Sequence, residues 1–244
     1  MSARYDTIGV DYANLRKPDS RIGAAIRNAL GDAQSVLNVG AGTGSYEPDH
    51  LDVMALEPSG EMIAQRSETS APVIQGVAEN LPFGDNTFDA SMGVLTIHHW
   101  ADAAKGLSEM ARVSRGPLVL LTYDATVRNF WLLDYFPELA TLDDDRMPPM
   151  KLYSDVWCEA EVRAVPIPAD CTDGFLAAYW QRPEMYLDPC LRAAMSSFWM
   201  IEGVEIGVSR LSSDLESGAW DAKYGYLRDQ VELDCGYRLV VASA

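Results

Sequence analysis

The first half of the chain alternates short, continuously apolar segments with longer segments that are apolar on one face only. Continuous apolar runs rich in β-branched residues are typical of strands buried on both faces of a parallel sheet. The short segments are Val36–Val39, Val53–Glu57, Val73–Gly76, Phe88–Leu95 and Pro117–Tyr123. Their regular spacing predicts parallel strands connected through helices, as in an α/β fold.

Three segments between the predicted strands have the pattern of helices. Arg21–Leu30 and Ala101–Val113 carry apolar residues at helical spacing, and Ser59–Ser67 begins with a serine that suits a helix N-cap. The residues expected to face inward are Ile22, Ile26, Leu30, Leu107, Met110 and Val113. Strands and helices that alternate in this way predict a Rossmann-like, doubly wound sheet with helices on both faces.

The second half of the chain breaks this alternation. It contains two aromatic-rich stretches and ends with Gly236–Ala244, an apolar segment that predicts a final strand. Val162–Pro168 is the expected partner of that strand, which gives a mostly parallel, seven-stranded sheet. We expect a cofactor-binding core with an N-terminal lid over residues 1–124, an inserted, mostly helical substrate and cap region over 125–235, and the returning strand over 236–244.

Composition and charge narrow the class of protein. Of the 244 residues, 48% are hydrophobic and 23% are charged, as in a globular protein. No apolar run approaches the roughly 20 residues of a membrane-spanning helix, and the first residues lack the apolar core of a signal peptide. The net charge of -17 repels a phosphate backbone. We therefore expect a cytoplasmic protein with neither a membrane nor a nucleic-acid partner, in an oligomeric state that the composition leaves open.

The four cysteines do not indicate a metal site. They form no CxxC pair, and no nearby histidine completes a zinc-binding pattern. We therefore expect no metal, and we interpret the cysteines as buried or half-buried thiols.

A glycine-rich segment directly follows the first predicted strand. Gly40, Gly42 and Gly44 allow a sharp turn and a close approach of the backbone to a ligand. Ligands of open α/β sheets lie at the carboxyl ends of the strands. Glu57 ends the second strand, where a carboxylate suits the hydroxyls of a ribose. NAD sites share these features, but Ser45 stands where the dinucleotide fingerprint has Gly or Ala.

Four motifs, in this order and spacing, carry a resemblance to a known family. VLNVGAGTG, LEPSGEM, GVAENLPFGDNTFD and VLTIHHW together resemble the class I S-adenosylmethionine-dependent methyltransferases of the ubiquinone/menaquinone-biosynthesis type, also called methyltransferase type 11. The resemblance covers roughly Tyr5–Asp124, about half of the chain. It implies S-adenosyl-L-methionine as the cofactor and in-line methyl transfer to oxygen, nitrogen or carbon of a small-molecule acceptor.

The resemblance implies a cofactor-binding role for the residues that match its motifs. These are Tyr12, Arg16, Asn38, Gly40, Gly42, Gly44, Glu57, Pro58, Met62, Ala78, Glu79 and Leu95. The glycines would lie against the methionyl and ribose portions, and Glu57 would bind the ribose hydroxyls. Pro58 and Met62 would flank the adenine, whose edge would meet Ala78 and Glu79.

Several of these assignments have an open alternative. The family usually has an acid where Asn38 stands and often has one where Val77 stands. At both positions a contact to the cofactor would therefore lack a charge. Arg16 is the candidate for the methionine carboxylate, because guanidinium suits bidentate carboxylate binding. Ordinary packing or surface roles are the alternative for Arg16 and Tyr12, and plain core packing is the alternative for Met62.

The candidate catalytic residues are His98, His99 and Asp124. The histidines follow the fourth predicted strand, on the side where the methyl group would point. One of them is a candidate general base or acceptor-orienting residue, since neutral imidazole accepts a proton near pH 7; helix capping and packing are the alternative. Asp124 follows the fifth strand and is a candidate for holding the acceptor, with a helix N-cap as its alternative.

The aromatic stretches of the second half have two interpretations. They line a pocket for a flat or apolar acceptor, or they form a hydrophobic core between the inserted helices and the sheet. The candidate substrate residues are Tyr5, Trp131, Tyr135, Tyr179, Trp180 and Arg182. Two other functions stay open at this point: a non-catalytic S-adenosylmethionine-binding module and, on the same fold, a NAD-dependent oxidoreductase.

Overall fold

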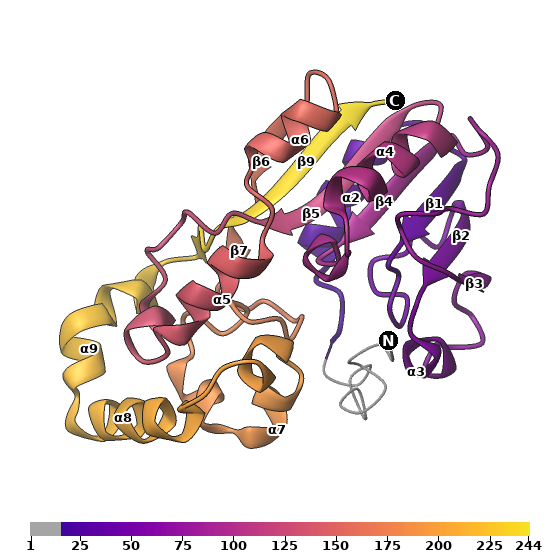
Figure 1. Cartoon of the computed structure of the whole chain (residues 1–244). Helices are drawn as coiled ribbons and strands as arrows, with labels where there is room; N and C mark the ends of the chain where they lie inside the picture. Colours follow the sequence, from indigo (N-terminus) through magenta and orange to yellow (C-terminus); the bar gives the residue numbers. More distant parts are fainter. Residues whose placement is uncertain (1–15) are drawn as a thin grey trace.

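Seven strands form one sheet that is parallel over most of its width (Figure 1). The computed structural model describes residues 16–244. The strands are β1 (Ser35–Val39), β2 (Asp52–Glu57), β3 (Val73–Gln75), β4 (Ala90–Val94), β5 (Pro117–Tyr123), β6 (Glu161–Ala164) and β9 (Tyr237–Ser243). Their order is β3-β2-β1-β4-β5-β9-β6, and only the pairs that include β9 are antiparallel. The predicted doubly wound, mostly parallel, seven-stranded sheet is confirmed.

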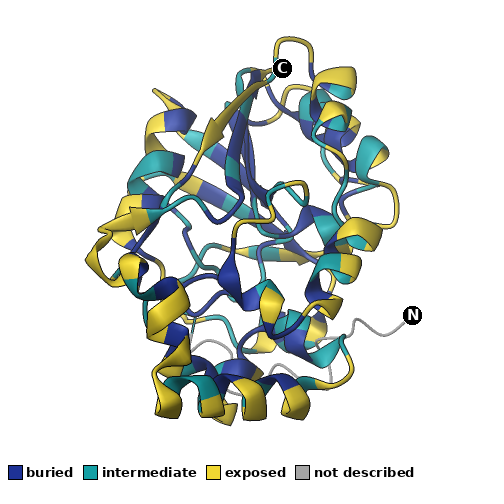
Figure 2. Cartoon of the chain, turned by 90° about the vertical axis from the view of Figure 1, so that its left-hand side faces the viewer, coloured by how far each residue is buried: buried dark blue, intermediate teal, exposed yellow. Residues whose placement is uncertain are grey.

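Helices cover both faces of the sheet because neighbouring residues of the buried strands point to opposite sides. Val36 packs in one hydrophobic cluster with α2 (Ser20–Leu30), whereas Leu37 packs in a second cluster with α4 (Ala103–Val113). Figure 2 shows the central strands as buried between partly exposed helices. The predicted inward-facing residues of both helices are buried, which confirms the helical periodicity. The short helix α3 (Gly60–Ala64) follows β2, and Ser59 caps it as predicted.

The chain between β5 and β9 builds most of a helical cap beyond the carboxyl ends of the strands (Figure 1). Its helices are α5 (Glu138–Arg146), α7 (Pro189–Ala193), α8 (Val204–Ser217) and α9 (Ala219–Tyr224), with 3-10 turns η3 (Trp131–Asp134), η4 (Pro183–Leu187), η5 (Ser196–Trp199) and η6 (Gly225–Asp229). The helix α6 (Lys151–Val156) packs instead beside α4. Across residues 16–244, no helix is both long enough and apolar enough to span a membrane.

The segment predicted as one strand over Val162–Pro168 is divided between two sheets. Its first part lies in β6, which pairs with β9, whereas β7 (Ile167–Pro168) pairs with β8 (Glu232–Leu233) in a separate two-stranded sheet. Pro166 stands between the two strands. Proline has no N–H to donate to the ladder, so a continuous strand through this position would lose a hydrogen bond.

Asp143 of α5 is a buried acid that makes stability depend on pH. Its side chain is 7% exposed, and burial raises the pKa of the carboxyl from 3.8 to about 7. Between these two pH values the folded state binds more protons than the unfolded state, so stability falls as pH rises. We expect Asp143→Asn to raise the free energy of unfolding at pH 8.5 by up to about 4 kcal/mol, and to change it little at pH 4.

Urea unfolding of wild type and variant at both pH values measures this difference. Asp144→Asn is the matched control, because Asp144 is the adjacent acid, is exposed, and forms an ion pair with Arg128. An Asp143→Asn variant with the same pH dependence as wild type would contradict the buried-acid explanation.

Candidate functional site

A cavity of about 1200 Å³ lies at the carboxyl ends of the central strands, between the sheet and the cap. On the sheet side its walls come from the loop after β1, the end of β2, and the segments that follow β3 and β4. On the cap side they come from the end of α5 and from η5. This is the edge at which open α/β sheets bind ligands.

The cavity brings together most of the predicted cofactor residues and both histidines. The predicted residues on its wall are Arg16, Asn38, Gly40, Gly42, Glu57, Pro58, Met62, Ala78, Glu79, Leu95, His98 and His99. Gly44 and Asp124 are described but do not line it, and Tyr5 and Tyr12 lie outside the described residues. The structure thus places these side chains at one site, and their individual roles stay predictions.

The glycine loop after β1 is fixed by the neighbouring strand. Gly40 has a positive φ of 69°, and its N–H donates to the carbonyl of Leu56 at 2.8 Å. A Cβ at Gly40 would lie 1.9 Å from Thr96 Oγ1. Because this position combines a left-handed backbone with contact to Thr96, only glycine fits there without strain.

Glu57 connects the glycine loop to the end of β2. Its carboxylate accepts from the N–H of Gly42 at 2.8 Å and from the N–H of Ser59 at 2.9 Å, and the residue is 6% exposed. An ionised carboxylate offers about four acceptor positions. The same group can therefore order the loop and accept hydrogen bonds from a ligand in the cavity.

A buried ion pair supports this loop from behind, and sequence reasoning missed it. Arg66 Nη2 lies 2.8 Å from Glu47 Oε1, with side chains 4% and 8% exposed, and Arg66 Nη1 donates to the carbonyl of Gly42. Asn38 Nδ2 donates to Glu47 Oε1 at 3.1 Å. Glu47 lies three residues after the VLNVGAGTG motif, and nothing in the sequence marked Arg66 as its partner.

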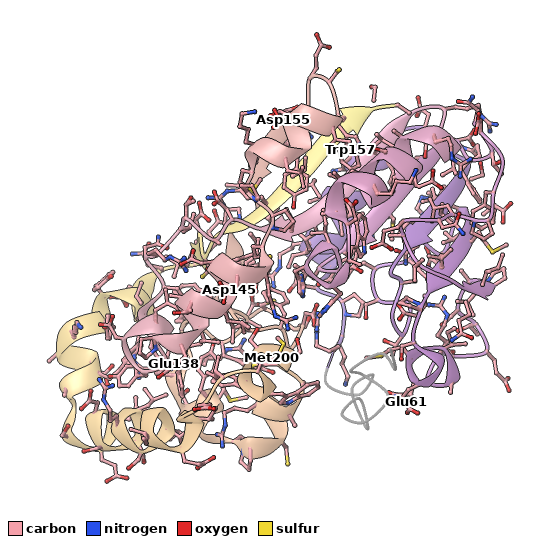
Figure 3. The ribbon with its side chains drawn as sticks, in the orientation of Figure 1. Glu61, Glu138, Asp145, Asp155, Trp157 and Met200 are labelled. Atoms are coloured by element: carbon pink, nitrogen blue, oxygen red, sulfur yellow. The ribbon has the colours of Figure 1, made fainter. Side chains whose placement is uncertain are left out.

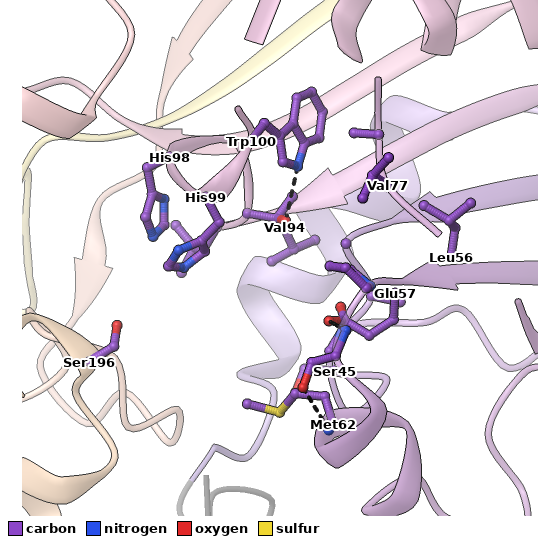
Figure 4. A pocket seen from close by; sticks show the side chains of 18 of the residues that line it. Ser45, Leu56, Glu57, Met62, Val77, Val94, His98, His99, Trp100 and Ser196 are labelled. Atoms are coloured by element: carbon purple, nitrogen blue, oxygen red, sulfur yellow. Dashed lines mark hydrogen bonds between the residues drawn. The ribbon is translucent and has the colours of Figure 1, made fainter. Parts of the chain in front are cut away.

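The two histidines lie where the chain leaves β4. Leu95 has a positive φ of 50°, and the turn leads into η2 (Ile97–His99). The ring centroids of His98 and His99 are 4.0 Å apart, and Figure 4 shows both rings directed into the cavity, between Glu57 and Ser196. Strained backbone at such a position is typical of functional sites.

His98 is neutral at physiological pH. Burial is the largest cause that holds its pKa well below 6.5, and the charges of His99 and Arg146 lower that pKa further. His98 is half-buried in the cavity wall, whereas His99 is exposed. A neutral imidazole has one ring nitrogen able to accept a proton or hydrogen bond.

The cap contributes six further residues to the cavity wall, none of which was predicted. They are Leu142, Asp145, Arg146, Ser196, Trp199 and Met200, of which Figure 3 labels Asp145 and Met200. The sequence showed an acidic turn and an aromatic stretch here, but neither pattern indicates which side chains face the sheet.

The predicted substrate residues of the second half do not line the cavity. They are Trp131, Tyr135, Tyr179, Trp180 and Arg182. Trp131 Nε1 donates to the carbonyl of Trp180 at 2.7 Å, and Tyr135 donates to Asp214 at 2.7 Å. All four aromatic residues are buried in the hydrophobic cluster that joins the cap to the sheet. This placement agrees with the core interpretation, because the aromatic side chains pack against one another.

Asp124 is engaged in a local turn outside the cavity. Its carboxylate accepts from the N–H of Thr126 at 3.0 Å and from Thr126 Oγ1 at 2.7 Å. Arg238 Nε lies 3.9 Å from the same carboxylate. A turn rather than a helix follows Asp124, so the expected helix N-cap is not formed either.

Comparisons with known proteins agree with this geometry. A family model described as a methyltransferase domain matches residues 37–120. A demethylmenaquinone methyltransferase of Mycolicibacterium paratuberculosis is 30% identical over 171 residues, which cover 64% of this chain and 72% of that protein. The corresponding protein of Paenarthrobacter aurescens is 34% identical over 123 residues, 44% of this chain and 49% of its own length. That match therefore spans about half of the relative.

A solved structure is similar over nearly the whole chain. It is a proposed methyltransferase from an antibiotic biosynthesis pathway of Anabaena variabilis, with 36% identity, a TM-score of 0.87, and coverage of 94% of this chain and 99% of that one. The chain belongs to the family of class I S-adenosylmethionine-dependent methyltransferases.

Proposed function

We propose that this protein transfers the methyl group of S-adenosylmethionine to a small-molecule acceptor held between the sheet and the cap. The observation that supports this most strongly is the continuous cavity, which has the glycine loop and Glu57 at one end and the imidazoles of His98 and His99 facing the cap. The cap encloses this space on the side opposite the sheet. A cavity with walls on both of these sides suits a small molecule.

The residues of the cavity fit the cofactor of the family. Asn38 Oδ1 is buried, lines the cavity, and has no hydrogen-bond partner among the described residues. A buried acceptor without a partner is costly, so a ligand N–H is expected there, such as an amino group. A Cβ at Gly42 would meet no atom within 4 Å, which leaves room for a ligand close to the backbone. Glu57 supplies the carboxylate for a ribose diol.

The protein contributes position and one proton acceptor. When bound, S-adenosylmethionine supplies an electrophilic methyl group on a sulfonium. Glu57 and the glycine loop hold the nucleoside end, and Met62 forms a buried apolar wall beside it. A ring nitrogen of neutral His98 accepts the proton that an O–H or N–H acceptor loses during attack.

Replacing Glu57 tests the cofactor end of the site. We expect Glu57→Gln to weaken binding of S-adenosylhomocysteine about 10- to 100-fold, because charge-assisted hydrogen bonds are lost and one amide N–H faces a backbone donor. Isothermal titration measures this affinity. Glu61→Gln is the control, since Glu61 lies nearby on α3, bonds to Gln65 and is not on the cavity wall.

The titration also separates the competing functions. Binding of NAD without binding of S-adenosylhomocysteine by the wild-type protein would overturn the proposed function. Equal affinities of wild type and Glu57→Gln would remove Glu57 from the cofactor site. The expected exclusion of nucleic acid and the cytoplasmic location rest on the sequence and stay predictions.

A further inference from the structure

We propose that Arg146 binds an anionic oxygen group of the methyl acceptor, so that the acceptor is a small organic acid, with a carboxylate as the expected group. This inference rests on the proposed function and specifies its substrate class. It concerns the part of the cavity wall that the cap supplies through the end of α5 and η5.

Arg146 is a half-buried cation that lacks a protein partner among the described residues. It is the last residue of α5 and lines the cavity. Among residues 16–244 its guanidinium makes no hydrogen bond or ion pair. The other arginine on the cavity wall, Arg16, is engaged: its Nε lies 2.6 Å from Asp173 Oδ1. The planar donor fork of an arginine matches a carboxylate, so a ligand anion is the expected partner.

The surroundings of Arg146 suit an acid with an apolar body. Trp199 and Met200 line the same end of the cavity, and Ser196 adds a hydroxyl. Asp145 is the acid nearest in sequence on this wall, but it is exposed, so water screens its charge. The guanidinium of Arg146 thus dominates the part of the wall that a ligand covers.

Arg146 and the two imidazoles line the same cavity, so one acceptor can contact both. The charge of Arg146 contributes to the low pKa of His98. An acceptor anchored by its carboxylate at Arg146 therefore places its other end beside His98, in the direction of the glycine loop. This arrangement fits the base role of His98 in the proposed reaction.

The test uses benzoate as a carboxylate probe and benzamide as its uncharged match. Both are titrated into the full-length protein saturated with S-adenosylhomocysteine. We expect benzoate to bind wild type at least about tenfold more tightly than benzamide, and Arg146→Gln to remove this preference. Arg146→Lys keeps the charge without the fork, so it keeps part of the preference. Arg163→Gln, which removes an exposed cation paired with Glu161, leaves the preference unchanged.

The remaining outcomes overturn the inference. Wild-type protein that binds benzoate no better than benzamide, or not at all, has no anion site at the cap. A benzoate preference that survives in Arg146→Gln belongs to another cation. If Arg146→Gln unfolds at a lower temperature than wild type and keeps the benzoate preference, Arg146 only stabilises the C-terminal end of α5. The initial S-adenosylhomocysteine titration tests the proposed function separately, because it measures cofactor binding before any benzoate or benzamide is added.

Discussion

Replacing His98 with alanine is expected to lower kcat about 10²–10⁴-fold for an O–H or N–H acceptor, the usual contribution of a positioned acid–base group. The affinity for S-adenosylhomocysteine is expected to stay within a few fold, because the proposed function assigns the nucleoside end to Glu57 and the glycine loop. The assay follows formation of S-adenosylhomocysteine, at saturating S-adenosylmethionine, with an acceptor identified in a substrate screen.

The pH dependence distinguishes a base from a packing residue. In the proposed reaction the neutral form of His98 is the active one, and burial holds the pKa of His98 well below 6.5. Activity that depends on this group is therefore expected to persist at pH 6.5 and to fall only at lower pH. A rate that changes with a midpoint above 6.5 would contradict His98 as the base.

The other two histidines are built-in controls. His50 is exposed and lies 3.5 Å from Asp49, outside the cavity wall, so His50→Ala is expected to leave kcat unchanged. His99 is exposed beside His98. Comparing the kcat of His99→Ala with that of His98→Ala therefore distinguishes a residue that orients the acceptor from one that accepts its proton. A near-normal kcat in His98→Ala would show that His98 is not the general base.

The cofactor end of the site was predictable because its signals are local. Val36–Val39 is a buried strand by composition, the glycines follow it at once, and Glu57 ends the next strand. In a parallel sheet these ends meet at one edge whatever the remaining chain does. A short sequence window therefore specifies both the strand and the residues that it places at the site.

The cap end was not predictable, because it depends on how distant segments pack. The aromatic residues near Trp131 and Trp180 were compatible with a pocket and with a core, and their burial against one another agrees with the core. Arg146 closes a helix in which four acids stand among few apolar residues, so the helix carries little periodic pattern. Only the folded chain shows that the end of this helix faces η5 and the histidines across the cavity.

Gly40→Ala is expected to have the largest effect of any single methyl group added to the site. The left-handed backbone at φ 69° costs about 1–2 kcal/mol for a residue with a Cβ. The new Cβ would also lie 1.9 Å from Thr96 Oγ1 and 2.8 Å from Thr96 Cβ, and such overpacking costs a further 1–3 kcal/mol or so. A loss of about 2–5 kcal/mol is a large share of the roughly 5–15 kcal/mol that stabilises a typical protein.

Two glycines with the same sign of φ separate the collision from the backbone strain. Gly218 caps α8 at φ 77°, and a Cβ there would meet nothing within 4 Å, so Gly218→Ala reports strain alone. Gly42→Ala adds its methyl group to open space at the cavity, so it is expected to weaken S-adenosylhomocysteine binding more than it lowers stability.

Thr96 provides the decisive comparison, through urea unfolding of Gly40→Ala, Thr96→Ala and the double variant. Removing Oγ1 and Cγ2 of Thr96 relieves the closest contact, so the double variant is expected to be more stable than the sum of the single effects predicts. Additive effects would show that the backbone conformation alone excludes alanine from Gly40. The close approach to Thr96 would then play no part in holding the glycine loop against the end of β4.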